Sequence, residues 1–94
     1  GEGMLFVFPE PADRLHDFWM KDTLVSLDMV FVRRDGTVSS VAAHVPAPKP
    51  HARDEDITHR AGVCRYVIEL RAGGAAAAGL RPGVRIAIPA LAVS

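Results

Sequence analysis

Residues Val25–Val45 read VSLDMVFVRRDGTVSSVAAHV and contain the clearest strand and turn signals in the chain. Side chains alternate between the two faces of a β-strand, so the first half of this stretch sorts into two sets. One face carries Val25, Leu27, Met29 and Phe31, and the other carries Ser26, Asp28, Val30 and Val32. Asp35-Gly36 then lies between two apolar runs, a strong hairpin signal in which both turn residues must accept a positive φ. We therefore expect Val38–Val45 to return antiparallel to the first strand.

Two further apolar runs predict strands outside this hairpin. Met4–Phe8 is bounded by Gly3 and Pro9, and it reads as a short strand buried on both faces. Val63–Arg71 alternates so regularly that we expect one continuous strand there. Its predicted inner face carries Cys64, Tyr66, Ile68 and Leu70, and its outer face carries Arg65, Glu69 and Arg71.

The segment between these strands predicts an irregular connection. Prolines alternate in Pro46–Pro50, where they remove backbone donors and favour an extended path that ends the sheet pairing. The following residues, His51–Gly62, are mostly charged or small, and Ile57 is the single large apolar residue among them. We expect this stretch to be an exposed, mobile loop.

The C-terminal part predicts one helix and one strand. Gly74–Leu80 is rich in alanine, the best helix former, and Gly79 suits a left-handed cap with Leu80 packing back. Pro82-Gly83 then predicts a turn into a last strand, Val84–Ile88, that ends before Pro89. Together the elements predict a small antiparallel β-sandwich or partly open barrel, with one short helix between the last two strands.

Composition limits the organisation and the partners of the chain. Its 94 residues are expected to form a single domain, 1–94, because a second independent core needs a longer chain. Eleven acidic and eleven basic residues leave no net charge to attract nucleic acid or anionic lipid. No apolar run is long enough for a transmembrane helix, so we expect no membrane insertion. The single cysteine, Cys64, forms no internal disulfide and is expected to pack in the core.

Several short motifs occur together in a recognisable order. They are Gly3–Phe8, Phe18–Thr23, Leu27-Asp28, Phe31, Asp35-Gly36, Tyr66–Glu69, Gly79-Leu80 and Pro82-Gly83. This pattern resembles the DUF192 family of small bacterial and archaeal proteins whose function is unassigned. The Phe-Trp-Met-Lys motif at Phe18–Lys21 is the most specific part of the resemblance.

The resemblance carries expectations beyond the residues themselves. It implies a further N-terminal strand and an Arg-x-x-Gly-Leu-Met stretch ahead of Gly3, so that this chain is a core fragment. It also implies a signal peptide in the full-length protein and a periplasmic or cell-envelope location. Three positions depart from the family pattern: Asp22 replaces a common Asn, Ala76 replaces an aromatic residue, and Val84 replaces a common Asp.

The densest cluster of polar and aromatic residues suggests a ligand-binding site. An aromatic wall, a cation, carboxylates and a hydroxyl within ten residues are suited to orienting a small polar ligand. The predicted ligand-binding residues are Trp19, Lys21, Asp22, Thr23 and Asp28, with Glu69 added from the resemblance. A structural reading stays open, in which Trp19 is core, Asp28 caps a turn, and Glu69 joins a charged cross-strand ladder.

Catalysis and metal binding have weaker support in the sequence. A hydrolase would use Asp28 or Glu69 with Lys21, but no nucleophile or paired-carboxylate motif is present, so we assign no catalytic residue. The stretch with His51, Asp54, Asp56 and His59 has metal-ligand types without a metal-binding spacing. We therefore predict no metal and no cofactor. The leading expectation is a noncatalytic module that binds a small ligand or a partner protein, ahead of a hydrolase and of a structural domain without a pocket.

Overall fold

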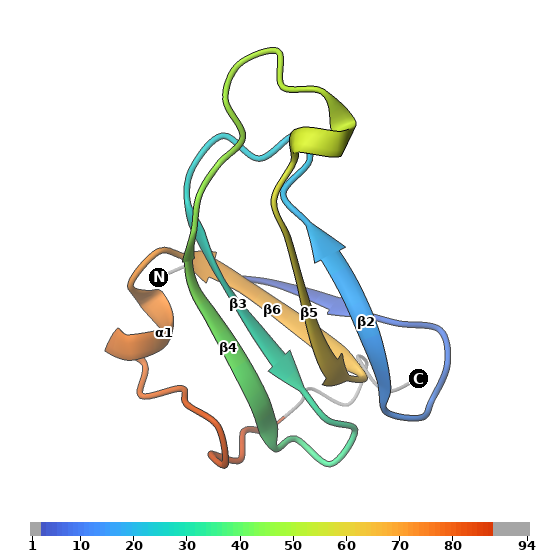
Figure 1. Cartoon of the computed structure of the whole chain (residues 1–94). Helices are drawn as coiled ribbons and strands as arrows, with labels where there is room; N and C mark the ends of the chain where they lie inside the picture. Colours follow the sequence, from blue (N-terminus) through green and yellow to red (C-terminus); the bar gives the residue numbers. More distant parts are fainter. Residues whose placement is uncertain (1–2, 88–94) are drawn as a thin grey trace.

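The computed structural model describes residues 3–87, which form two antiparallel β-sheets (Figure 1). The larger sheet has the order β1-β6-β3-β4, and the smaller one pairs β2 with β5. Their bounds are β1 Gly3–Val7, β2 Arg14–Trp19, β3 Leu27–Val32, β4 Val38–Val45, β5 His59–Cys64 and β6 Tyr66–Arg71. Two single-turn helices complete the described residues: the 3-10 helix η1, Asp54–Asp56, and α1, Gly74–Ala77. The expected antiparallel β architecture with one short helix near the C-terminus is confirmed, and the described strands form no closed barrel.

The β3–β4 hairpin forms where the sequence predicts it, with a different turn. The Arg33 N–H donates to the Thr37 carbonyl at 2.8 Å, and the Gly36 N–H donates to the Arg33 carbonyl at 2.9 Å. Only Gly36 has a positive φ, +91°, so the expectation of two left-handed residues is wrong. A three-residue loop with one left-handed glycine closes this hairpin, and it brings a register shift near Val32.

The two faces of β3 pack into two separate hydrophobic clusters, as its alternation predicts. Met29 and Phe31 belong to the first cluster, on the side of the smaller sheet, together with the buried side chains of Met20, Val45, Ile57, Cys64 and Val67. Val30 and Val32 belong to the second cluster, which includes Ala75 of α1. Because both faces of β3 are covered, this strand forms the centre of the fold.

The predicted continuous strand Val63–Arg71 is interrupted at Arg65, so that prediction is wrong. Residues before the break belong to β5 in the smaller sheet, and residues after it belong to β6 in the larger one. The Arg65 N–H donates to the Val32 carbonyl at 2.8 Å, which holds the crossing point against β3. Cys64 therefore faces the first cluster while Tyr66 faces the second, although alternation places them on one face.

The smaller sheet is formed by segments that we expected to be irregular. The polar-looking residues Arg14–Trp19 form β2, and its antiparallel partner β5 begins at His59. The expected loop His51–Gly62 therefore ends at Thr58, four residues earlier than predicted, and it contains η1. Burial of His16 and Phe18 on the inner face explains why this sequence adopts a strand.

β1 is a partly exposed edge strand, not the strand buried on both faces that its apolar sequence suggests. It pairs only with β6, and the side chains of Met4 and Val7 are 59% and 39% exposed. Leu5 and Phe6 face opposite clusters and are partly buried. Among residues 3–87, no strand therefore pairs with the outer backbone edge of β1.

The helix and the turn after it follow the sequence prediction closely. Gly79 has a φ of +70°, and the Leu80 N–H donates to the Ala75 carbonyl at 2.9 Å, so Leu80 packs back on the second cluster. The Val84 N–H donates to the Arg81 carbonyl at 3.1 Å and closes the predicted turn.

The segment after this turn differs from the predicted strand Val84–Ile88. Its described residues make one isolated bridge, between Arg85 and Thr37. Within residues 3–87, α1 is therefore not followed by a further strand. Ile88 and Pro89 lie outside the described residues. No helix in the described part of the chain combines the length and hydropathy needed to cross a membrane.

Candidate functional site

Three phenylalanine rings form a concave wall between the two sheets. Phe6 comes from β1, Phe8 follows it, and Phe18 projects inward from β2. The Phe6 and Phe18 ring centroids lie 4.9 Å apart in an edge-to-face arrangement, and Phe8 and Phe18 lie 6.2 Å apart in the same way. The Phe8 ring is also stacked on the His16 ring, with centroids 3.7 Å apart.

This wall borders a pocket of about 390 Å³, which we call the aromatic pocket. Its lining residues are Phe6, Phe8, Asp17, Phe18, Trp19, Lys21, Thr23 and Glu69. The volume lies in the range of pockets that hold small molecules. Four of the six residues that the sequence nominates for a ligand site, Trp19, Lys21, Thr23 and Glu69, thus meet around one cavity.

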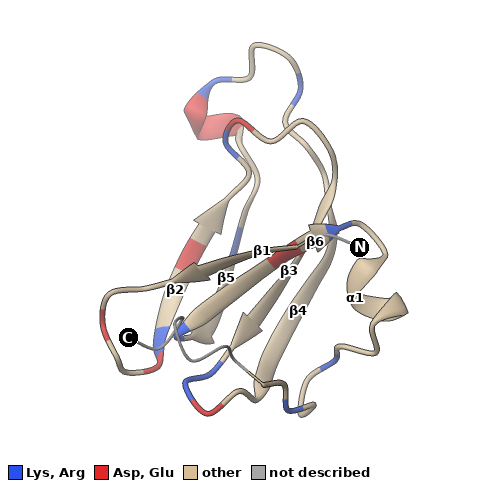
Figure 2. Ribbon diagram, turned by 180° about the vertical axis from the view of Figure 1, so that it is seen from behind, with Lys and Arg blue, Asp and Glu red and all other residues tan. Residues whose placement is uncertain are grey.

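Glu69 is the acidic residue of β6 and faces the space between the sheets. In Figure 2 a red segment marks an acidic position within β6, whose sequence contains only Glu69 as an acid. Its neighbours in register are Met4 and Met29, so the charged cross-strand ladder that we considered does not form. Burial raises the pKa of Glu69 above its ordinary value, and no hydrogen bond or ion pair with another described residue offsets that cost.

Charged side chains at the rim of the aromatic pocket are held in pairs. The Lys21 ammonium lies 5.1 Å from the centroid of the Trp19 ring and 3.3 Å from an Asp54 carboxylate oxygen. His59 Nδ1 lies 2.6 Å from Asp17 Oδ2, and the His59 ring lies 5.6 Å from that of Trp19. Trp19 is 38% exposed, so it belongs to the rim and not to the core.

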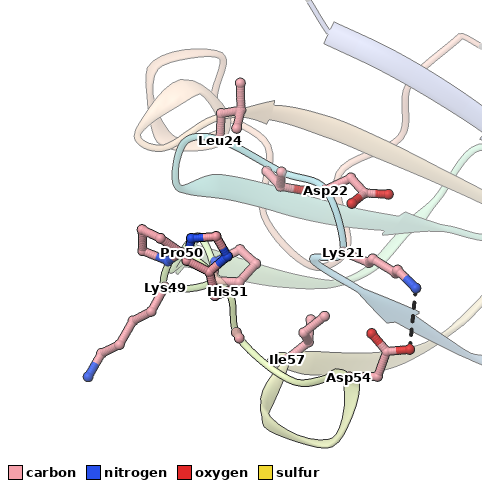
Figure 3. Close-up of a pocket in the computed structure, with 11 residues that line it drawn as sticks. Lys21, Asp22, Leu24, Lys49, Pro50, His51, Asp54 and Ile57 are labelled. Carbon is pink, nitrogen blue, oxygen red and sulfur yellow. Dashed lines mark hydrogen bonds and ion pairs between the residues drawn. The ribbon is translucent and has the colours of Figure 1, made fainter.

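A second cavity of about 530 Å³, the loop pocket, adjoins the first (Figure 3). Lys21 and Thr23 line both pockets, while Asp22 lines only this one. Asp22 has a φ of +62° in a turn closed by the Thr23 N–H and the Met20 carbonyl at 3.1 Å. Asn and Asp tolerate this left-handed conformation better than most residues, so Asp22 suits the turn.

Asp28 lies away from the other nominated residues. It is 1% exposed, and its side chain points to the opposite face of the larger sheet from Glu69, beneath α1. Its carboxylate accepts backbone hydrogen bonds from His44 at 2.8 Å, Gly73 at 3.1 Å and Ala75 at 2.9 Å. Pairing of Asp28 with Lys21 in one reaction has no geometric basis, because the sheet separates them.

Three of the four residues that we considered as metal ligands contact other side chains instead. Asp54 pairs with Lys21, Asp56 pairs with Arg53, and His59 pairs with Asp17. Within residues 3–87, no three side chains of His, Cys, Asp or Glu are grouped so that they could hold a metal ion.

Sequence reasoning missed the contributions of Asp17 and the three phenylalanines to the aromatic pocket. Asp17 was placed in a polar connection because β2 was not recognised as a strand. The signal was present in the two-residue spacing of His16, Phe18 and Met20, all of which face inward.

Comparison with known proteins places the chain in a family. The model of the family DUF192, described as "Uncharacterized ACR", matches residues 1–88. A crystal structure from Sinorhizobium meliloti 1021, described as "a putative transcription regulator", is 37% identical over 88% of this chain and 59% of its own, with a TM-score of 0.68. One from Novosphingobium aromaticivorans DSM 12444, described as a protein of unknown function, is 33% identical over 93% of this chain and 57% of its own, with a TM-score of 0.69.

No curated protein matches the chain. The chain spans less than two thirds of the length of either crystal structure. The family match, however, extends over nearly the whole chain. The chain belongs to the DUF192 family of uncharacterised proteins.

Proposed function

We propose that this domain is a noncatalytic module that binds a small organic ligand in the aromatic pocket. The observation that carries the proposal is the position of Glu69, a carboxylate between aromatic walls without a donor among the described residues. A partly buried carboxylate in such surroundings loses solvation, and a ligand that donates to it restores the lost interaction.

The lining residues set the general character of the ligand. Aromatic side chains offer apolar contact area, while Glu69, Lys21 and Thr23 offer a few polar groups to fix orientation. Nucleic acid is not the proposed ligand, because equal numbers of acidic and basic residues leave no net charge to attract phosphates.

Trp19 provides a direct test because it is the only tryptophan and lines the pocket. We expect its fluorescence to change on addition of a ligand from a panel of amines, sugars, amino acids and nucleotides. Replacement Glu69→Gln should weaken the response, whereas Glu10→Gln, which alters an exposed ion pair with Arg14, should not. Silence of the wild-type protein across the panel, by fluorescence and by NMR shifts of the pocket residues, would contradict the proposal and favour a structural domain.

A hydrolase is the second candidate, and one observation favours it. Burial raises the pKa of Glu69, which is the direction that a general acid requires at neutral pH. The Asp17–His59 pair beside the same pocket supplies a second titratable group. Turnover of chromogenic esters or glycosides that disappears in the Glu69→Gln variant would favour catalysis over binding.

We also propose a cell-envelope location for the full-length protein, on the basis of the family resemblance. A fusion of its native N-terminal region to a reporter that is active only after export tests this. Export of the reporter is expected, and retention in the cytoplasm would contradict the proposal.

A further inference from the structure

The charges around the aromatic pocket are unequally compensated. Lys21 has Asp54 as an ion-pair partner and the Trp19 ring beneath its ammonium. Asp17 has the imidazole of His59 at 2.6 Å. Glu69 has neither a cation nor a hydrogen-bond donor within the described part of the chain. The uncompensated charge of the aromatic pocket is therefore the negative charge of Glu69.

The pocket walls complement a positive charge as well. The faces of aromatic rings carry a negative electrostatic potential, and a cation within about 6 Å of a ring centroid is attracted to it. Phe6 and Phe8 each pack edge to face with Phe18, and all three border the cavity that Glu69 also lines, although one face of Phe8 is stacked on the His16 ring. Resting on the proposed function, we infer that the ligand is a small organic ammonium ion whose charge lies beside Glu69 and against these rings.

Other ligand classes fit the pocket less well. A carboxylate or phosphate would be repelled by ionised Glu69, and the lysine that could attract it is already paired with Asp54. A neutral sugar carries no positive charge to compensate Glu69, and the Trp19 ring already has the Lys21 ammonium 5.1 Å away and the His59 ring 5.6 Å away. A purely apolar ligand would remove water from Glu69 without replacing its hydrogen bonds.

The affinity for an ammonium ion should depend on pH through Glu69. The charged groups that share the pocket are Asp17 and Lys21, both from the β2 side, while the register neighbours on β1 and β3 are the uncharged Met4 and Met29. Burial raises the pKa of Glu69, and the ammonium prefers the ionised carboxylate. Affinity should therefore increase as the pH rises through that raised pKa and then level off.

Two ligands of nearly equal shape test the charge requirement. Choline and 3,3-dimethylbutan-1-ol differ in a quaternary nitrogen that the second replaces by carbon. We expect NMR shifts of Phe6, Phe18 and the Trp19 indole to report binding of choline at least about tenfold tighter than the neutral analogue, because only choline carries the positive charge that Glu69 and the aromatic rings attract. The Glu69→Gln variant should lose about the same factor, whereas Glu10→Gln should bind choline like the wild-type protein.

The possible outcomes separate this inference from the proposed function. Equal binding of both compounds, or unchanged choline binding by Glu69→Gln, would overturn the ammonium inference while the pocket still binds ligands. Absence of choline binding, with a sugar or a nucleotide binding instead, would also overturn it. Absence of any binding across the wider panel would overturn the proposed function itself. Folding of each variant is checked by the dispersion of its NMR spectrum.

Discussion

The Asp28 carboxylate on β3 accepts a hydrogen bond from the backbone N–H of Ala75 in α1, at 2.9 Å. The same carboxylate also accepts from the N–H groups of Gly73 and His44, so it joins the start of the helix to the end of β4. His44 has a φ of +53°, which its hydrogen bond to Asp28 helps to hold. Asp28 thus serves as a buried junction among three elements.

Replacement of Asp28 by alanine should destabilise the fold strongly. Three backbone N–H groups would lose their acceptor. The hydrogen bond of Ala75 is buried and those of Gly73 and His44 are partly buried, and an unsatisfied buried donor costs about 1–3 kcal/mol. Because such costs are not additive, we expect a loss of roughly 3 kcal/mol in the free energy of unfolding, measured by urea denaturation. The control Asp22→Asn, at an exposed left-handed position, should change stability by less than about 0.5 kcal/mol. A loss of less than about 1 kcal/mol for Asp28→Ala would contradict the junction role.

The fold was predictable where local pattern and tertiary environment agree. The β3–β4 hairpin combines strict alternation with a turn glycine, and the alanine helix combines propensity with a glycine cap. The break at Arg65 was not predictable, because the alternation of Val63–Arg71 continues through it. Only the passage of the chain from the smaller sheet to the larger one changes the cluster that each side chain faces. β1 was misjudged because an apolar sequence does not show whether a strand lies at an edge.

The candidate site shows a similar division. Nearness along the chain correctly suggested that Trp19, Lys21 and Thr23 share a surface. The family resemblance added Glu69, which no local pattern connects to them. Asp28 was grouped with these residues because it is close in sequence, but the pleat of β3 turns its side chain to the other face of the sheet. Sequence distance therefore identified neighbours on the chain without identifying the face on which each one lies.

Gly62 permits close packing between β5 and the core, so Gly62→Ala should be costly. A Cβ at this position would overlap the ring of Phe31, which is 1% exposed and has little room to move. Overpacking of this kind costs about 1–3 kcal/mol. The matched control is Gly79→Ala, where the added Cβ has open space and only the positive φ costs about 1 kcal/mol. Thermal and urea denaturation should show that Gly62→Ala is less stable than Gly79→Ala. The reverse order of stability would contradict this packing.

Cys64 should be unreactive in the folded protein. Burial raises the pKa of its thiol to about 11, and the nearby Asp13 carboxylate acts in the same direction. At pH 8 we expect alkylation by iodoacetamide to be slow in the native state and fast in urea, with mass spectrometry as the readout. Because the folded pKa lies above the unfolded value of 9.0, this thiol should also lower stability as the pH rises from about 9 to about 11. Rapid native alkylation at pH 8 would show that the thiol is accessible and ionised.

Glu69→Gln should make the ligand-free protein more stable at neutral pH while it weakens ligand binding. Burial raises the folded pKa of Glu69 above its ordinary value of 4.5, so the contribution of Glu69 to stability is fully present below that ordinary value. The contribution is lost as the pH rises through the folded pKa, because the ionised carboxylate is poorly solvated in the aromatic pocket. Glutamine carries no charge to desolvate, so the variant should exceed the wild-type protein in melting temperature at pH 7 and approach it near pH 4. The control Glu10→Gln should show no such gain, since Glu10 lies on the surface beside Arg14. A residue that serves binding at the expense of folding is expected to behave in this way. A gain in melting temperature that persists unchanged at pH 4 would mean that ionisation of Glu69 is not its cause.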